Sequence, residues 1–351
     1  MDLPTEMQLS GLVVQLLSNL LDVPMREIHV RNRGAGSMSD LLLDAGNHKF
    51  AVELRSSGVA APVTAGIAKI KSSATRRRKD VAALLVVPYM GDVGRKLCED
   101  AGVSWIDLSG NAHIVARGVR IHIAGLPNKF KRLGRPSNVF APKSSRICRL
   151  LLLRAGEALT QREIARATAM DEGFTSRIVK KLEQDGFVVR DESGAVKAKN
   201  PDLLLDAWRE TYAFRKHRII RGHVATRSAD LLLKDLAEKL IRHGVDHAAT
   251  GLGAAWLLSR FAGFRIVTFY LRESPAEDIL QSLGFRHDDR GANVWLAVPN
   301  DEGVFHGADV REGIRCVHPV QVFLDLKDHP ERAEEAAVRL REQYLKWRRN
   351  V

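Results

Sequence analysis

Cysteine, aromatic residues and long apolar runs are all scarce in this sequence. Among its 351 residues there are three cysteines, and aromatic residues make up 6%. Cys98, Cys148 and Cys316 are far apart, odd in number and without the close spacing of zinc ligands, which argues against a disulfide framework or a structural zinc site. We therefore expect three reduced thiols that pack as small apolar side chains in a reducing compartment.

Membrane and export signals are missing as well. No apolar run reaches the roughly 18 residues that a transmembrane helix requires. The first residues, MDLPTEMQLSG, lack the basic region and the small-residue cleavage site of a signal peptide. We expect a cytoplasmic protein without membrane contact.

Positive charge, by contrast, is in excess. Lys and Arg total 54 against 42 Asp and Glu, which gives a net charge of +12. A soluble protein this basic suits a polyanion, and nucleic acid is the most common one. Charge alone is equally compatible with a surface that is merely basic, so the distribution of the charge along the chain has to decide.

Hydrophobic periodicity divides the chain into three domains and a linker. Residues 1–126 alternate helices and strands in the order α-β-β-β-α-β-α-β-β, which predicts a mixed α/β domain. Residues 127–143 are basic and proline-containing, as expected of a linker. Residues 144–200 predict a small helical domain with two strands. Residues 201–351 predict another α/β domain, which begins with a long basic helix over 203–223 and closes with a charged helix over 330–347.

Residues 144–200 have the pattern of a winged helix-turn-helix. Thr160 and Glu163 form a capping-box pattern before a short helix. The next helix, which starts near Gly173, carries Thr175, Ser176 and Arg177 in its first turns. Those turns are the part that a recognition helix inserts into the major groove, where Arg contacts guanine and Ser or Thr contacts bases or phosphates.

Further DNA contacts are expected from the start of the first helix, the recognition helix, the wing and the linker. These residues are Thr160, Gln161, Arg162, Lys180, Lys181, Arg190, Lys197, Lys199, Lys129, Lys131, Arg132 and Arg135. The predicted basic helix that follows should extend the footprint through Arg209, Arg215, Lys216, Arg218 and Arg221. Charge on both sides of the module favours DNA binding over a winged helix used only for protein contacts.

The segment TQREIARATAMDEGFTSRIVKKLEQDGFVVRD, residues 160–191, resembles the winged helix of bacterial transcriptional regulators of the MarR type. The resemblance implies a protein that binds double-stranded DNA and associates with the nucleoid. Regulators of this kind are often homodimers.

Two carboxylates in the first domain stand where a metal site can form. Asp40 opens one strand and Glu53 lies on the next, with Arg55 two residues later. The arrangement resembles the PD-(D/E)xK nuclease superfamily, which has a restriction-endonuclease-like fold. Two departures are Ser39 before Asp40, in place of Pro, and Arg55 in the Lys position. Both interpretations stay open: a Mg²⁺-dependent DNA endonuclease, or a domain that serves structure or DNA contact.

A second resemblance covers more of the chain. The segments AGVSWIDLSGNAHI (residues 101–114) and VHPVQVFLDLKDHPERAEEAAVRLRE (residues 317–342) are similar to AbiEi antitoxins of type IV toxin–antitoxin systems. That resemblance implies a regulator that represses its own promoter and has a protein toxin as partner. This sequence departs from the pattern by having an α/β domain ahead of its winged helix.

The C-terminal domain has the distant layout of a nucleotidyltransferase, but the strand predicted over 265–271 contains no Asp, so no transfer chemistry is expected. The glycines of 250–256 lack the Lys-Ser/Thr of a phosphate-binding loop, which favours a tight strand-to-helix turn. The leading hypothesis is therefore a sequence-specific DNA-binding regulator that is not an enzyme. It requires no cofactor, and Mg²⁺ enters only if the first domain is an active nuclease.

Overall fold

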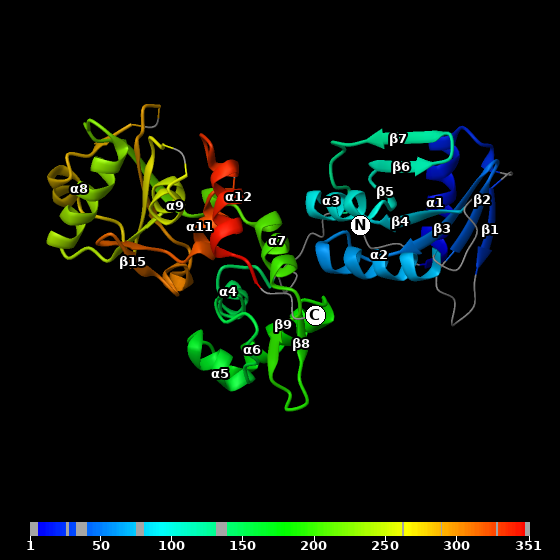
Figure 1. Ribbon diagram of the computed structural model, residues 1–351, viewed down its shortest axis with the longest axis horizontal. Coiled ribbons are helices and arrows are strands. Elements are labelled where there is room, and N and C mark those ends of the chain that lie inside the picture. The colour runs from blue at the N-terminus through cyan, green and yellow to red at the C-terminus, as the bar shows by residue number, and fades with distance from the viewer. Residues whose placement is uncertain are drawn as a thin grey trace. The chain divides into compact units, whose positions relative to one another are not determined.

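The computed structural model describes residues 6–25, 28–32, 41–74, 81–130, 139–261, 263–288, 290–327 and 329–347. The chain forms two compact units, Met1–Pro136 and Ser137–Val351 (Figure 1). Within the described residues, no helix is long and apolar enough to cross a membrane.

The first unit is a mixed sheet with the strand order β1-β2-β3-β4-β5-β6-β7. Strands β1 to β3 form an antiparallel meander, β3, β4 and β5 run parallel, and β6 and β7 form a hairpin. The predicted order of elements is confirmed. The elements are α1 (Glu6–Leu21), β1 (Ile28–Asn32), β2 (Leu41–Ala45), β3 (His48–Leu54), α2 (Ala60–Ala74), β4 (Val81–Val87), α3 (Asp92–Ala101), β5 (Ser104–Asp107), β6 (Ala112–Ala116) and β7 (Val119–Ile123).

Strand β4 explains why this sheet has a core on each face. Successive side chains of a strand point to opposite faces, so Leu84 joins a cluster with Leu17 of α1, whereas Leu85 joins a cluster with Val63 of α2 and Cys98 of α3. A strand that is buried on both faces has to be apolar throughout. The uninterrupted apolar sequence of β4 follows from this position.

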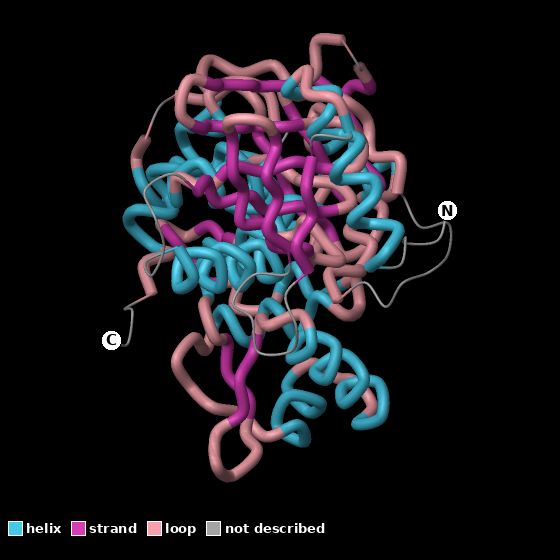
Figure 2. Tube along the Cα trace, turned by 90° about the vertical axis from the view of Figure 1, so that its right-hand side faces the viewer, coloured by secondary structure: helices cyan, strands magenta, loops and turns pink. Residues whose placement is uncertain are grey.

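The second unit begins with the winged helix, formed by α4 (Ser145–Leu153), α5 (Gln161–Ala167), α6 (Glu172–Gln184), β8 (Val188–Arg190) and β9 (Val196–Ala198). Strands β8 and β9 pair antiparallel, and Leu159 adds one bridge to Val196. Figure 2 shows these two wing strands beside the helices of the module. Gly186 follows α6 in the left-handed conformation, with φ of 76°, which glycine adopts readily after a helix.

The C-terminal domain is a mixed sheet with the strand order β13-β10-β14-β12-β11-β16-β15. Helices α8 and α9 pack on β12, while α11 and α12 pack on α9. Its elements are α7 (Pro201–Thr211), the 3-10 helix η2 (Phe214–Lys216), β10 (Arg218–His223), α8 (Ala229–Arg242), β11 (His247–Thr250), α9 (Gly251–Ser259), β12 (Val267–Leu271), α10 (Glu277–Ser282), β13 (Arg286–His287), β14 (Val294–Val298), the 3-10 helix η3 (Glu302–Phe305), β15 (Asp309–Arg311), β16 (Ile314–Cys316), α11 (Pro319–Asp325) and α12 (Ala333–Tyr344).

The long helix predicted over 203–223 is wrong. Asn200 caps α7, which ends at Thr211, and the chain then enters strand β10 between β13 and β14. The β-branched pair Ile219 and Ile220 suits that position in the sheet. The hairpin β15–β16 and helix α11 were not predicted, and the charged C-terminal helix is shorter than expected.

Candidate nucleic-acid interface

Two capping arrangements fix the helix-turn-helix. The Thr160 side chain accepts from the Glu163 N–H at 3.2 Å, and the Glu163 carboxylate accepts from the Thr160 N–H at 2.7 Å, so the predicted capping box is present. The Asp171 carboxylate caps α6 by accepting from the Phe174 N–H at 2.7 Å. Both caps satisfy amide groups that a helix leaves unpaired at its start. The start of α6 is therefore held in a defined position.

Thr175 does not belong to the exposed face of α6, which corrects the prediction of a DNA contact. Its side chain is fully buried, and its hydroxyl donates to the Asp171 carbonyl at 2.9 Å. Thr175 lies three residues before Ile178 and four before Val179, so it shares their inward face. Ser176 and Arg177 follow on the outer side.

The outward face of α6 is polar and basic. Ser176 is half-exposed, Arg177 and Lys180 are exposed, and Gly173 and Gln184 continue the face at helical spacing. Two of the five were not predicted contacts: Gly173, which offers close backbone approach, and Gln184, which offers an amide. A helical projection of the same sequence would have identified both.

Phe174 holds two of the cations beside α6. The guanidinium of Arg177 lies 5.7 Å from the centre of the Phe174 ring, and the Lys143 ammonium lies 5.6 Å from it. Lys143 was not among the predicted contact residues, although it belongs to the predicted linker. Cations at this distance from an aromatic face are attracted to it.

Three other predicted contact residues have carboxylate neighbours. Lys181 is half-buried and pairs with Asp185 at 2.7 Å, one turn later on α6. Arg162 is exposed and lies 3.4 Å from Glu172. Arg190 pairs with Glu183 at 3.1 Å. Surface pairs of this kind exchange readily for phosphate contacts because each contributes little stability in water.

The wing turn is built on one acidic side chain. Asp191 accepts hydrogen bonds from the Ser193 hydroxyl, at 2.7 Å, and from the N–H groups of Ser193 and Ala195. The hydroxyl and, to a smaller extent, the N–H groups lower the pKa of Asp191. Lys199 is exposed and Lys197 half-exposed, whereas Gln161 lies beside Arg190, with 3.0 Å between its amide and Nη2. Lys197 on β9 and Lys199 just after it are thus available for phosphate contact.

Of the predicted linker contacts, only Lys129 lies within the described residues, and its side chain is exposed. Its N–H donates to the Ser109 hydroxyl at 3.2 Å, which ties it to the first unit. Lys131, Arg132 and Arg135 lie outside the described residues.

The basic segment after the winged helix is partly used for internal packing. Arg209 pairs with Glu334 at 2.8 Å and stacks on Phe323, and Arg221 lies 5.2 Å from the ring centre of Trp295. These two arginines stabilise the C-terminal domain, so the expected extension of the DNA footprint through them is not supported. The other three are exposed: Arg215, Lys216 and Arg218.

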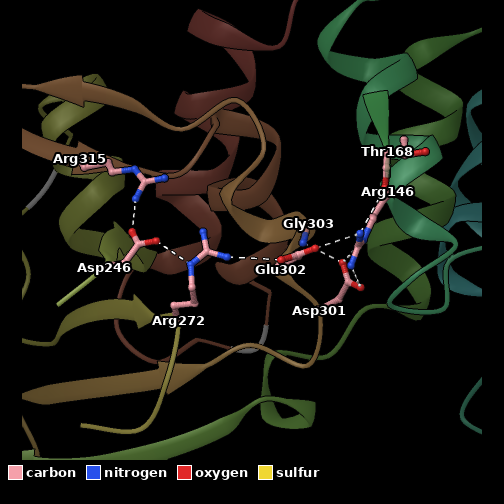
Figure 3. A network of polar contacts seen from close by, with 8 residues as sticks. All are labelled: Arg146, Thr168, Asp246, Arg272, Asp301, Glu302, Gly303 and Arg315. Carbon is pink, nitrogen blue, oxygen red and sulfur yellow. Dashed lines mark hydrogen bonds and ion pairs between the residues drawn. The ribbon is translucent and has the colours of Figure 1, made fainter. Parts of the chain in front are cut away.

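A chain of ion pairs connects the winged helix to the C-terminal domain (Figure 3). Arg146 of α4 donates through Nε and Nη2 to the two carboxylate oxygens of Asp301, at 2.7 and 2.8 Å. Its Nη1 donates to the Thr168 carbonyl at the end of α5 and lies 3.3 Å from Glu302. The hydrogen bonds with Asp301 raise the pKa of Arg146. The network continues through Arg272, Asp246 and Arg315.

A buried polar cluster lies in the C-terminal domain. The Asp325 carboxylate, on α11, accepts hydrogen bonds from Tyr212, from Tyr270 at 2.9 Å, from Gln321 at 2.6 Å and from Thr250. Burial raises the pKa of Asp325 to about 6, and the four donors oppose that rise. The Gln321–Asp325 motif of the AbiEi resemblance is therefore a structural element that joins α11 to β11 and β12.

The other motif of that resemblance is also structural. Asp107, fully buried at the end of β5, accepts from the N–H groups of Met90, Ser109 and Asn111, at 2.9 to 3.1 Å. The Asn111 amide pairs with both backbone groups of Leu126. The motif shapes the turn between β5 and β6 and fastens the chain that leaves β7.

The candidate nuclease residues are only partly within the described chain. Asp40 lies outside it. Glu53, on β3, is fully buried, and one of its oxygens lies 2.7 Å from Arg55 and 2.8 Å from Lys69 of α2. Lys69 was not predicted, because no sequence pattern links it to Glu53. The described residues bring together one carboxylate and two cations, which falls short of the two carboxylates that a Mg²⁺ site of this kind requires.

Among the described residues, one other group of side chains has the composition of a metal site. Ligand atoms of Glu99, His113 and His122 all lie within 4.8 Å of one another. His113 and His122 are paired across the β6–β7 hairpin, and their Nδ1 atoms are 3.1 Å apart, a hydrogen-bond distance. A hydrogen bond between the rings accounts for this approach without a metal.

The two family-model matches fall on the second unit. Residues 149–197 match the model of the MarR family, and residues 197–346 match that of the transcriptional regulator, AbiEi antitoxin, of the type IV TA system. No curated protein sequence matches the chain. Among solved structures, a repair endonuclease from Pyrococcus abyssi is similar over 30% of this chain and 48% of its own length, at 15% identity and a TM-score of 0.23. As expected from its motifs, the second unit is similar to a MarR-type winged helix followed by an AbiEi-type regulator domain.

Proposed function

We propose that the protein is a sequence-specific transcriptional regulator, an AbiEi antitoxin-like repressor that reads the major groove with α6. The outward face of α6 carries the proposal: Ser176, Arg177 and Lys180 share it and have no part in the core. Their chemistry matches direct readout, because Arg contacts guanine and hydroxyl groups contact bases or phosphates. The MarR and AbiEi matches support the same function.

The neighbouring cations supply affinity without sequence preference. Lys143 lies beside α6, while Lys197 and Lys199 lie on the wing. Lysines in these places contact phosphates and release counterions, so binding should weaken as salt is raised. A homodimer that binds two half-sites, in the cytoplasm and on the nucleoid, is the expected working form, and a protein toxin is the expected partner.

The test is operator selection followed by a binding titration. Sites are enriched from random duplex DNA, and the best site is titrated with the wild type, Arg177→Ala and Arg339→Ala. Arg339 is a matched control because it is an exposed helical arginine on α12, paired with Glu342. We expect Arg177→Ala to weaken specific binding by about 1–3 kcal/mol and the control to bind as the wild type. Equal affinity of all three proteins would contradict the recognition-helix assignment.

A second candidate function is a metal-dependent DNA endonuclease, and Lys69 is the observation that favours it. Lys69 brings an ammonium to Glu53, and it supplies the lysine that the nuclease pattern lacks at Arg55. Plasmid DNA is incubated with Mg²⁺ or Mn²⁺ and the wild type, Asp40→Ala, Glu53→Gln or, as a control, Asp92→Asn, an exposed carboxylate on α3. Cleavage that is lost only in the first two variants would establish the nuclease. The absence of cleavage by the wild type would exclude it.

A further inference from the structure

Two histidines and a glutamate lie together at the β6–β7 edge of the sheet in the first unit (Figure 1). His113 of β6 and His122 of β7 are direct partners in the antiparallel hairpin, and Glu99 belongs to α3. Ligand atoms of the three side chains all lie within 4.8 Å of one another. His113 is half-buried and the other two residues are exposed, so the group is accessible to a dissolved ion.

The register of the sheet explains why these side chains meet. Trp105 of β5 pairs with His113, which pairs with His122, and the side chains of directly paired residues point to the same face. Trp105 packs in one apolar cluster with Cys98 of α3, so this is the face that α3 covers. Glu99 is the next residue of α3. Three strands and one helix thus bring the group together.

The two imidazoles are spaced as ligands of one ion. Their Nδ1 atoms are 3.1 Å apart. Two nitrogens bound to a tetrahedral zinc ion, each at roughly 2.0–2.1 Å, lie about 3.3 Å from each other. Without an ion, one ring donates to the other across this distance. With an ion, each ring carries its hydrogen on Nε2 and turns the Nδ1 lone pair towards the metal.

Glu99 supplies a third ligand. Its carboxylate lies within 4.8 Å of the two ring nitrogens, and a change of rotamer in this exposed side chain closes the remaining gap. Imidazole and carboxylate together suit zinc, and zinc sites with three protein ligands complete the tetrahedron with water. We propose that Glu99, His113 and His122 bind one zinc ion.

Zinc in this position stabilises the edge of the sheet. Strand β7 is the last strand of the order and pairs with β6. Helix α3 packs on α2 and β5. An ion held by Glu99 and His122 links α3 directly to β7, the strand after which the chain continues towards the predicted linker. A ligand that binds the folded chain and not the unfolded chain raises stability by mass action.

This site is separate from the candidate nuclease residues. Glu53 lies on β3, three strands from His113 in the strand order. Neighbouring strands are about 4.8 Å apart, so the two residues are about 14 Å apart and one ion cannot bind both. The ligand chemistry differs as well, because Mg²⁺ prefers oxygen ligands and water over imidazole. The zinc site therefore depends neither on the nuclease nor on DNA binding.

The test titrates the full-length protein with zinc chloride in calorimetry, and with magnesium chloride for comparison. The variants are His113→Gln, His122→Gln, Glu99→Gln and, as a matched control, His243→Gln, an exposed histidine at the end of α8. We expect one zinc ion per wild-type chain and much weaker binding of magnesium. Each histidine variant of the site should weaken zinc binding at least tenfold and Glu99→Gln at least threefold, whereas the control should bind as the wild type.

Thermal unfolding with and without zinc provides a second measurement. Zinc should raise the melting temperature of the wild type and the control, and raise it less or not at all in the two histidine variants of the site. The melting temperature without zinc shows whether each variant is folded. Because His122 is exposed, His122→Gln tests the site even if the half-buried His113 is needed for folding.

Each outcome decides the proposal. Wild-type protein that binds no zinc, or binds magnesium equally well, overturns it. A folded His122→Gln variant with wild-type zinc affinity overturns it too, because the ion would then bind elsewhere. An equal loss of affinity in His243→Gln would show adventitious binding to surface histidines only. Wild-type affinity in Glu99→Gln would overturn the assignment of the third ligand.

Discussion

Arg146 and Asp301 form a two-point ion pair between the first helix of the winged helix and the C-terminal domain (Figure 3). Their side chains are 10% and 12% exposed, so both charged groups are largely shielded from water. A pair in this state specifies geometry more than it adds stability, because desolvation offsets much of the attraction. The pair thereby ties α4 to the turn of the C-terminal domain that carries Asp301.

The first prediction concerns that pair. Arg146→Met should lower the free energy of unfolding by about 3 kcal/mol, because it leaves the Asp301 carboxylate buried without its partner. Chemical denaturation at pH 7 measures the change. Arg332→Met is the control, since Arg332 forms an exposed pair with Glu335, and it should leave the midpoint unchanged. A double variant of Arg146→Met with Asp301→Leu that regains stability would confirm the unpaired charge as the cause; a double variant no more stable than Arg146→Met would contradict it.

The second prediction concerns the cap of the recognition helix. Asp171→Ala should destabilise the protein by about 1 kcal/mol, because the Phe174 N–H loses its acceptor at the start of α6. Asp171→Asn keeps a capping side chain and should be near wild type. The midpoint of urea denaturation distinguishes the two. Equal losses in both variants would show that the negative charge, rather than the hydrogen bond, stabilises this end of the helix.

The third prediction separates two neighbours on α6. Thr175→Val should leave DNA affinity unchanged and cost at most about 1 kcal/mol of stability, since the Thr175 hydroxyl only donates to the Asp171 carbonyl. Ser176→Ala should leave stability unchanged and weaken operator binding. Denaturation and gel-shift titrations are run on both proteins. The reverse pattern would mean that Thr175, not Ser176, faces the DNA.

Local patterns in the sequence predicted the elements of the winged helix well. The capping box of Thr160 and Glu163 and the turn at Gly186 depend on residues close together in the chain, so their chemistry is visible in the sequence. The prediction that Thr175 contacts DNA was wrong because it considered only the type of residue and not its position around the helix. Ile178 and Val179 define the inward face, and Thr175 shares it.

Long-range contacts could not be predicted in the same way. Lys69 approaches Glu53 only because α2 packs on β3, and Arg149 reaches Gln321 across 172 positions of sequence. The prediction of one helix over 203–223 gave weight to the basic residues of this segment and not to the β-branched pair Ile219 and Ile220, which lies in strand β10. Residues that become neighbours only when the chain folds have no fixed spacing in the sequence, so no local pattern identifies them.

The fourth prediction is a loss of stability in weak acid. Burial lowers the pKa of His217 and of His318 to about 4, and the positive charge of Arg149 adds to the effect. In the unfolded chain both histidines titrate near 6.5. As pH falls from 6.5 to 4, these two histidines bind protons in the unfolded chain but not in the folded protein. At pH 5 each histidine should therefore reduce the free energy of unfolding by about 2 kcal/mol relative to pH 7.

Asp325 changes the stability of the protein with pH in the opposite direction from the two histidines, so it provides a control for this test. Its folded pKa of about 6 exceeds the value near 3.9 of an unfolded Asp, so the folded protein binds that proton first and gains stability as pH falls through 6. His217→Gln should reduce the loss between pH 7 and pH 5, whereas Asp325→Asn should increase it. Urea denaturation of the three proteins at both pH values measures the differences. Burial disfavours the charged form of each group, which is the protonated form of His217 and the deprotonated form of Asp325, so the two variants should change the loss in opposite directions. Equal losses in all three proteins would contradict the pKa shifts assigned to His217 and Asp325.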